Sequence, residues 1–270
     1  SHSMSLTWFD AHCHFDFSAL DQYRDADWSL AHSMGLSGII IPGVSRQQSA
    51  CLPEFVQRHP YCHRAVGLHP YWCEQHRDAD IDWLDAHLHH NADKGSVVAI
   101  GECGMDRHLI KSQGISWDEQ WHWCMAQIEL AERHKKPLIL HIRGAHDEVA
   151  AELKRRRFAY GGLVHAFSGS LQQGLRWHEL GFALGVGGAM THPGATRLRK
   201  TLSDLPLESL LLETDSPDMR PAFMRRAENS PAMIPLYGAI LASIKDHSLT
   251  EISAVTQQNL YRIFPSLTVN

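Results

Sequence analysis

Eight short apolar segments, each ending on glycine or polar residues, alternate with longer segments of helical character along this chain. The apolar segments span Leu6–Phe15, Gly38–Val44, His63–His69, Val97–Glu102, Pro137–His141, Gly162–His165, Gly181–Gly187 and Leu210–Asp215. Strands that alternate with helices imply a parallel sheet, because a parallel connection needs a crossover. Eight such units within 270 residues predict an α/β fold, a (β/α)8 TIM barrel in a single domain.

Local signals mark two of the intervening helices. Ser116 is followed three residues later by a glutamate, and so is Ser248, which is the pattern of a capping box at a helix start. We expect the first of these helices to end just before Pro137 and the second before Pro265, since proline cannot continue a helix.

The composition restricts the class of protein. Hydrophobic residues make up 44% of the chain and charged residues 20%, which is typical of a globular protein with a large core. No run approaches the ~18 apolar residues of a membrane span. The net charge of −5 excludes a polycation, so a nucleic-acid partner would need a local basic patch. The 20 histidines direct attention to metal ligands.

The N-terminal residues and the cysteines give further expectations. Ser1–Met4 has the character of a cloning remnant, which leaves residues 5–270 for the barrel. The start shows no secretory leader pattern, and none of the six cysteines forms a Cys-x-x-Cys pair. We therefore expect free thiols, a cytoplasmic protein, no membrane partner, no protein partner and a monomer.

The first apolar segment carries two histidines, His12 and His14, on the same side of an expected strand. Asp10 and Asp16 share that side, because side chains in a strand alternate with period two. The alternative is a pair of core histidines. Acidic neighbours favour a metal site, since carboxylates orient imidazole ligands.

Four more segments each end on an ionisable residue: Glu102, His141, His165 and Asp215. A lone histidine at such a place is more often structural. In a barrel, however, the strand ends converge on the rim that carries the active site. Four imidazoles and two carboxylates exceed the needs of one catalytic ion and suit two. Zn, Mn, Fe, Ni and Mg all remain possible.

The motifs resemble, in the same order, those of the TatD-like metal-dependent hydrolases, and within them the YjjV-like branch. The resemblance rests on Asp10–Asp16, Gly67–Pro70, Gly101–Asp106, His141–Arg143, His165–Gly169, Glu213–Pro217 and Asn259–Phe264, and in the branch on Ser168–Gln173 and Gly185–Gly188.

The resemblance implies a TIM barrel with two divalent ions. One ion would be held by His12, His14, Glu102 and Asp215, and the other by His141, His165 and the shared Glu102. Catalysis would use an activated water, with Asp215 as the proton acceptor and Glu102 as the bridging ligand.

Substrate contacts are expected from residues beside these ligands. His69 ends the third segment, and Arg143 lies two residues after His141, where a guanidinium suits a phosphate. Arg46, Arg107, Arg220, Arg225 and Arg226 belong to loops on the same side of the barrel. The basic run Lys154–Arg157 belongs to the opposite side, where positive charge suits a helix end.

Three functions follow from these features. The resemblance favours a phosphodiesterase, a deoxyribonuclease acting on DNA ends. The alternative is hydrolysis of another ester or amide bond, as in an aminoacyl-tRNA, a lactone or a cyclic amide. A binding protein on an inactive barrel is the third, and the complete ligand set disfavours it.

Overall fold

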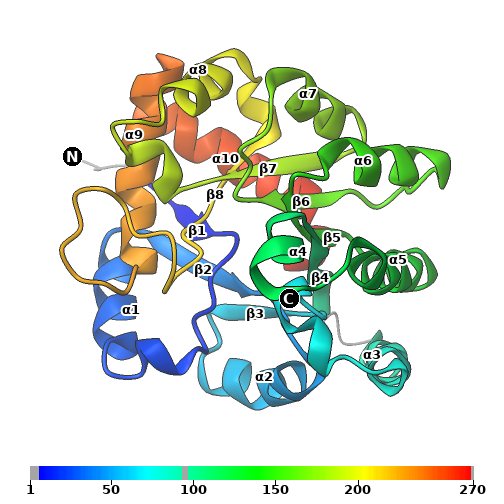
Figure 1. Ribbon diagram of the computed structural model, residues 1–270. Coiled ribbons are helices and arrows are strands. Elements are labelled where there is room, and N and C mark those ends of the chain that lie inside the picture. The colour runs from blue at the N-terminus through cyan, green and yellow to red at the C-terminus, as the bar shows by residue number, and fades with distance from the viewer. Residues whose placement is uncertain (1–5, 93–96, 269–270) are drawn as a thin grey trace.

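The computed structural model describes residues 6–92 and 97–268, and within them eight parallel strands form one sheet in sequence order (Figure 1). The strands are β1 Trp8–Asp10, β2 Leu36–Ile41, β3 Cys62–Val66, β4 Val97–Asp106, β5 Leu138–Arg143, β6 Gly162–His165, β7 Phe182–Val186 and β8 Leu210–Leu212. The expected TIM barrel is thereby confirmed. The expected cloning remnant, Ser1–Met4, lies outside the described residues.

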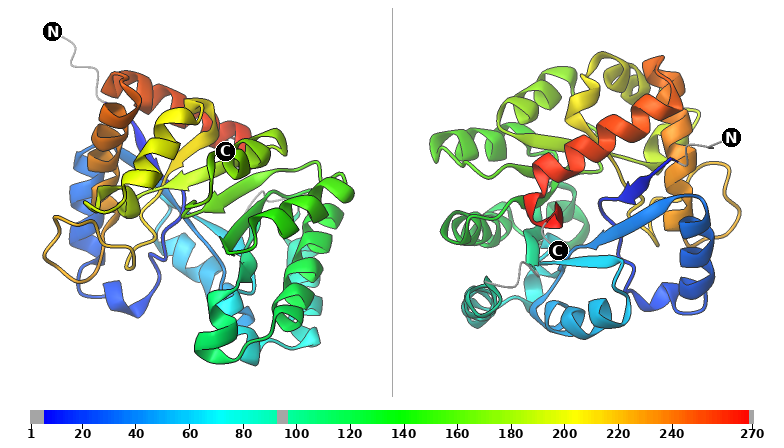
Figure 2. Two further views of the ribbon diagram at one scale, coloured as in Figure 1. Left: turned by 45° about the horizontal axis from the view of Figure 1, so that its top comes forward. Right: turned by 180° about the vertical axis from the view of Figure 1, so that it is seen from behind.

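Helices surround the sheet on its outer side (Figure 2). They are α1 Arg24–Ser33, α2 Arg46–Arg58, α3 Asp78–His90, α4 His108–Gln113, α5 Trp117–His134, α6 His146–Arg155, α7 Leu171–Glu179, α8 Thr196–Asp204, α9 Ile234–Lys245 and α10 Leu249–Ile263. Short 3₁₀ helices are η1 Ser18–Leu20, η2 Pro70–Gln75, η4 Gly188–Thr191, η5 Leu207–Ser209, η6 Pro231–Met233 and η7 Pro265–Thr268. Among the described residues, no helix is long and apolar enough to cross a bilayer.

Both predicted helix starts are confirmed, but only Ser248 forms a complete capping box, and Ser116 forms the cap without the reciprocal bond from Glu119. Ser116 Oγ accepts a hydrogen bond from the backbone N–H of Glu119 at 3.1 Å, at the start of α5. Ser248 Oγ does the same for Glu251 at 3.1 Å, at the start of α10. Each cap satisfies a backbone donor that the first turn of a helix leaves free.

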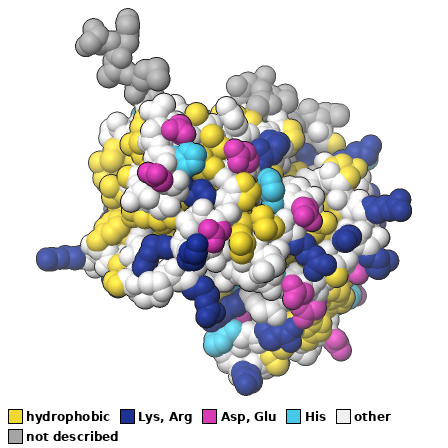
Figure 3. Space-filling model, turned by 90° about the horizontal axis from the view of Figure 1, so that it is seen from above, with side chains coloured by type: hydrophobic (Ala, Val, Ile, Leu, Met, Phe, Trp, Pro, Cys, Tyr) yellow, Lys and Arg dark blue, Asp and Glu magenta, His cyan; other side chains and the backbone are white. Residues whose placement is uncertain are grey.

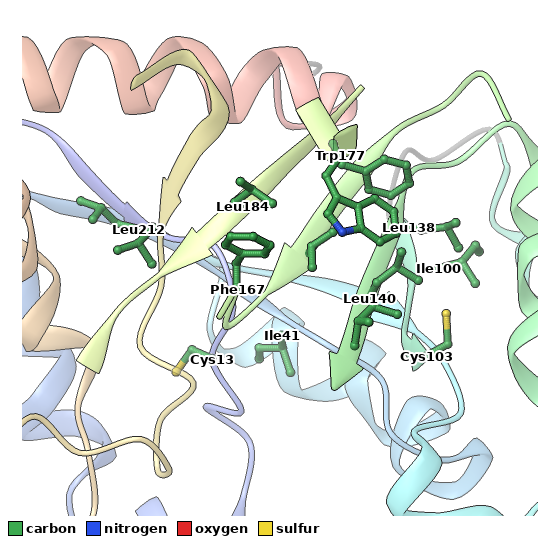
Figure 4. Packing of buried hydrophobic residues seen from close by; sticks show 14 of the residues in the cluster. Cys13, Ile41, Ile100, Cys103, Leu138, Leu140, Phe167, Trp177, Leu184 and Leu212 are labelled. Carbon is green, nitrogen blue, oxygen red and sulfur yellow. The ribbon is translucent and has the colours of Figure 1, made fainter. Parts of the chain in front are cut away.

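The core has two layers. Between the strands and the helices, Ile100, Leu138, Leu140 and Leu184 pack with Trp177 of α7 (Figure 4). Inside the barrel, a second cluster of buried side chains comprises Phe9, Ala11, Ile40, Ala65, Val98, Ala99, Ile139, Leu163, Ala183, Leu211, Leu260, Ile263, Phe264 and Leu267. The interior therefore supports the site from below, and the C-terminal helix contributes to that support.

The first strand is shorter than predicted. It ends at Asp10 instead of continuing to Phe15, so the regular alternation expected around His12 and His14 is wrong in detail. The physical reason is that the following backbone bonds to two different segments: Cys13 N–H donates to Ile40 O of β2 at 3.0 Å, and His14 N–H donates to Ser216 O, after β8, at 2.8 Å. A regular ladder with one neighbour cannot form there.

Candidate metal centre

Seven ionisable side chains converge where the strands end. They are His12 and His14 after β1, His69 after β3, Glu102 on β4, His141 on β5, His165 at the end of β6 and Asp215 after β8. The register of the sheet aligns two of them directly, because His141 and His165 are paired residues on adjacent strands. All six of the expected ligands, together with His69, are thus brought to one place.

Glu102 lies at the centre of this cluster, and its two oxygens face different partners. Oε1 lies 3.1 Å from His12 Nε2 and 3.5 Å from His14 Nε2. Oε2 lies 3.1 Å from His69 Nε2, 3.4 Å from His141 Nδ1 and 3.7 Å from His165 Nε2. A carboxylate with ligand-type nitrogens on both sides has the arrangement of a bridge between two cations.

Asp215 completes the side occupied by the first two histidines. Its Oδ1 lies 3.2 Å from His12 Nε2 and 3.1 Å from His14 Nε2, and its Oδ2 lies 3.6 Å from His165 Nε2. The backbone of Asp215 is left-handed, with φ of 56°. Such a conformation is unusual outside glycine and is found disproportionately at functional sites.

Several buried atoms of the cluster have no hydrogen-bond partner within the described chain. They are His12 Nδ1 and Nε2, His14 Nδ1, Glu102 Oε1 and Asp215 Oδ1. Buried polar atoms are normally paired, since an unpaired one costs roughly 1–3 kcal/mol. The facing imidazole nitrogens and carboxylate oxygens are the donor set of a divalent cation, so these residues fit a metal centre.

Two further carboxylates orient the imidazoles from outside the cluster. Asp106 Oδ2 lies 2.8 Å from His141 Nε2, which directs Nδ1 of that ring inward. Glu213 Oε1 lies 2.9 Å from His165 Nδ1, which directs Nε2 inward. Gly185 leaves the space for Glu213, because a Cβ at that position would collide with the carboxylate. Pairing of this kind fixes which nitrogen is presented to a metal.

The charges of the cluster shift its pKa values strongly. Burial lowers the pKa of His12, but the Glu102 and Asp215 carboxylates overcome this and raise it well above its usual range. Burial also lowers the pKa of His141, but the Asp106 and Glu102 carboxylates outweigh burial and raise this pKa to about 9. Burial raises the pKa of Glu102, and the surrounding imidazoles, led by His69, bring it well below its usual range.

A network of hydrogen bonds connects the end of β1 with the segment that follows β8. Asp10 Oδ1 accepts from the backbone N–H of His12 at 3.2 Å and of Thr214 at 3.0 Å. Asp10 Oδ2 accepts from Thr214 Oγ1 at 2.5 Å, and Thr214 Oγ1 accepts from Ser216 Oγ at 2.8 Å. We call Asp10, Thr214 and Ser216 the seam network. Sequence reasoning found Asp10 but not its two partners.

The cluster forms the floor of a cavity of about 390 Å³. The walls combine aromatic, cationic and polar side chains: Phe17, Tyr71, Trp72, Arg143, Ser168, Asp218 and Met219. Phe17 stacks on His14, with 4.5 Å between ring centroids. A concave, partly aromatic wall around a few polar groups is typical of a small-molecule or nucleotide site.

The rim arginines expected from the sequence differ in their surroundings. Arg107 pairs with Glu148 at 2.6 Å and lies over the Trp117 ring, and Arg226 pairs with Asp27 at 2.7 Å. Arg143, in contrast, lines the cavity and forms no ion pair with a described residue. It is thus the arginine best placed to meet a substrate anion.

Comparison with known proteins gives consistent matches over nearly the whole chain. The family model described as "TatD related DNase" matches residues 9–265. The chain is 36% identical over 262 residues to the uncharacterized metal-dependent hydrolase YjjV of Escherichia coli, covering 97% of this chain and 99% of the relative. It is 31% identical over 264 residues to a protein named 3'-5' ssDNA/RNA exonuclease TatD from Pectobacterium parmentieri, covering 95% and 98%.

Solved structures agree. The crystal structure of YjjV from Escherichia coli aligns with a TM-score of 0.90 at 35% identity, covering 97% of this chain and 99% of that one. A TatD-family hydrolase from Entamoeba histolytica aligns with a TM-score of 0.82 at 22% identity, covering 97% and 99%, which supports the fold. With its His, Glu and Asp cluster at the mouth of the barrel, the chain belongs to the TatD-related DNase family and is a metal-dependent hydrolase.

Proposed function

We propose that this hydrolase is a binuclear phosphodiesterase, a deoxyribonuclease that acts on DNA ends. The observation that carries the proposal is Glu102, whose two oxygens face separate groups of ligand-type nitrogens. In our assignment His12, His14, Glu102 and Asp215 hold the first ion, and Glu102, His141 and His165 hold the second. Zn, Mn, Mg, Fe and Ni are the candidate metals.

The catalytic roles follow from this assignment. Divalent ions supply Lewis acidity, which activates water and stabilises charge on the attacked phosphodiester. Asp215 lines the cavity, where it would accept the proton of the attacking water. Glu102 keeps the two groups of ligands at a fixed spacing. His69, which also lines the cavity, contacts Glu102 and the substrate.

The substrate side of the proposal is supported by the cavity wall and the relatives. Arg143 would bind a phosphate beside the scissile bond, and Tyr71, which is 43% exposed, offers a ring to a nucleobase. Some relatives carry the name of a single-stranded DNA and RNA exonuclease. The free cysteines Cys13, Cys51, Cys62, Cys73, Cys103 and Cys124 support a cytoplasmic location.

Activity on a substrate panel tests the proposal. The panel contains single-stranded DNA, duplex DNA, RNA, an aminoacyl-tRNA and a neutral lactone, with metal-free enzyme as the control. We expect metal-dependent cleavage of DNA. Turnover of the lactone or the aminoacyl ester, without cleavage of DNA by any metal form, would overturn the phosphodiesterase proposal in favour of another ester or amide bond.

A substitution at Arg143 tests the phosphate contact. Arg143→Ala should raise KM for a DNA oligomer while changing hydrolysis of a small activated phosphodiester much less, because binding energy remote from the reacting bond is lost mainly for the large substrate. The dependence of KM on salt should flatten by about 0.7 unit in a log–log plot for single-stranded DNA. Equal effects on both substrates would contradict this role for Arg143.

A further inference from the structure

We propose that the loop of residues 217–229, between β8 and α9, is a docking surface for a single-stranded polynucleotide whose terminal nucleotide occupies the metal cavity. The inference rests on the proposed phosphodiesterase function and adds a dependence of binding on the length of the polynucleotide substrate. In Figures 1 and 2 this loop is the gold segment that projects beyond α1 and α9.

The loop begins inside the metal cavity. Asp218 and Met219, its second and third residues, line the cavity together with Asp215. Asp218 N–H also donates to Asp215 O at 2.8 Å, so the start of the loop is bonded directly to the residue that carries the carboxylate. A strand leaving the cavity on this side would pass over the rest of the loop.

The backbone of the loop is fixed by side chains at its base. The Asn229 side-chain amide donates to Thr214 O at 3.0 Å, to Asp218 O at 3.0 Å and to Met219 O at 3.2 Å. These three bonds join the two ends of the loop. Because the ends are joined, the loop can present side chains to a ligand at little cost in conformational entropy.

The outer part of the loop is held by contacts with two other segments of the rim. The Arg226 guanidinium forms two hydrogen bonds with the Asp27 carboxylate of α1, at 3.0 and 2.7 Å. On the other side, Ala222 N–H donates to Thr191 Oγ1 of η4 at 2.9 Å. Arg226 therefore serves as an anchor, which separates it from the other arginines of the loop.

The outer side chains of the loop are an aromatic ring and two cations. Phe223 is 53% exposed. Arg220 and Arg225 are both exposed, and within the described chain neither forms an ion pair with a carboxylate, although Arg220 Nη1 donates to Arg225 O at 3.3 Å. Aromatic rings that stack bases, beside arginines that meet phosphates, are the combination found in sequence-tolerant binding of single strands. Unpaired bases are needed for that stacking, so the surface selects a single strand over a duplex.

The length of the DNA substrate is the variable that tests the proposed docking surface. KM is measured with a dinucleotide and with a 20-residue single-stranded DNA, for the wild type and for Phe223→Ala. We expect the substitution to raise KM for the 20-mer by about tenfold, within the range for one stacked base, and to leave the dinucleotide unchanged. Tyr261→Ala is the matched control, since Tyr261 is a 40% exposed aromatic residue on α10.

Salt dependence tests the arginines separately. Arg220→Gln and Arg225→Gln should each lower the slope of log KM against log salt by about 0.7 for the 20-mer. Arg58→Gln, at the exposed C-terminal end of α2 on the opposite side of the barrel, is the matched control and should leave the slope unchanged.

The outcomes separate this inference from the proposed function. Cleavage of the dinucleotide and the 20-mer with equal KM in all variants would overturn the docking surface and leave the phosphodiesterase intact. Absence of cleavage of either substrate would overturn the phosphodiesterase. Loss of binding to anionic phospholipid vesicles in Phe223→Ala, with unchanged DNA kinetics, would overturn the inference by assigning the loop to a membrane.

Discussion

The backbone N–H of Tyr71 donates to Nδ1 of His69 at 3.0 Å, so the ring proton of neutral His69 lies on Nε2. Burial lowers the pKa of His69 to about 4, which keeps the ring neutral near pH 7. Nε2–H then donates to Glu102 Oε2 at 3.1 Å. His69 thereby holds the oxygen of Glu102 that faces His141 and His165.

Removal of the His69 side chain should lower the activity or the affinity for metal, although His69 is not one of the assigned metal ligands. His69→Ala should lower kcat or the affinity for metal by about 10- to 100-fold, the range for partners that orient metal ligands. Steady-state kinetics with elemental analysis measures both. His122→Ala, an exposed histidine on α5, is the control and should change neither. Wild-type kinetics and metal content in His69→Ala would contradict this positioning of Glu102 by His69.

Protons and metal ions should compete for the imidazoles. Without an ion, His141 has a pKa of about 9 and is protonated at neutral pH. A metal ligand must be deprotonated, so the affinity for metal should rise as the pH increases from about 6 to about 9, and binding should release protons. Titration calorimetry in two buffers of different ionisation enthalpy measures this release. A constant affinity over the interval would show that the histidines are not ligands.

At the scale of elements, β1 and β8 form no ladder within the described sheet, and irregular contacts connect them. Asp215 N–H donates to His12 O at 2.8 Å, and Ala11 N–H donates to Leu212 O at 3.1 Å. The seam network of Asp10, Thr214 and Ser216 adds side-chain bonds across the same junction. It thus sets the distance between His12, after β1, and Asp215, after β8.

The seam network predicts a selective loss of metal. Thr214→Val removes the hydroxyl while conserving the shape of the side chain. The substitution should lower the affinity for the ion assigned to His12, His14 and Asp215 by about 10- to 100-fold and leave the affinity for the other ion unchanged. Elemental analysis at limiting metal measures the loss. Thr214→Ser should restore binding, and Thr201→Val, at a buried threonine of α8, should have no effect. Equal loss of both ions in Thr214→Val would indicate general destabilisation instead.

The sequence predicts the elements that carry the site better than the contacts within it. His141 and His165 lie on regular strands, so their convergence follows from barrel topology. Glu102 lies where the register of β4 shifts between Gly101 and Cys103, and topology alone does not predict that irregularity. Sequence cannot show that Asp106 and Glu213 orient two of the imidazoles, because a carboxylate is visible in a sequence but its partner is not.

Ion pairs between residues distant in the sequence limit the prediction of which rim arginines are free to bind a substrate. Arg107 and Arg226 belong to the predicted side of the barrel, but Glu148 and Asp27, far away in the sequence, occupy their guanidinium groups. His12 and His14 reach the site although the regular strand expected to carry them ends at Asp10. Backbone bonds to two neighbours, which no local pattern encodes, replace that strand.

At the scale of the whole molecule, charge is distributed without a strong bias. On the face drawn in Figure 3, Lys and Arg side chains are mixed with Asp and Glu side chains. This agrees with the net charge of −5, and a nucleic acid bound to such a surface would make few phosphate contacts. Attraction of a nucleic acid would therefore depend on local groups such as Arg143 and those of loop 217–229.

Metal removal should lower the stability of the entire barrel. Ions that bind only the folded state stabilise it, by about 2.7 kcal/mol at a concentration 100 times Kd. For a chain of this size that corresponds to roughly 5–10 °C in Tm. Thermal unfolding before and after treatment with a chelator measures the shift, and reconstitution with metal should reverse it. An unchanged Tm would contradict binding at the cluster.

His12 and Asp215 stand more than two hundred positions apart in the sequence, yet His12 Nε2 lies 3.2 Å from Asp215 Oδ1 across the seam. During synthesis on the ribosome, the first histidines emerge long before the last carboxylate exists. The half-made protein therefore cannot assemble the complete cluster, and any premature stop upstream of β8 removes Asp215 together with the last strand of the sheet. A product truncated upstream of β8 therefore lacks part of the arrangement on which hydrolysis would depend.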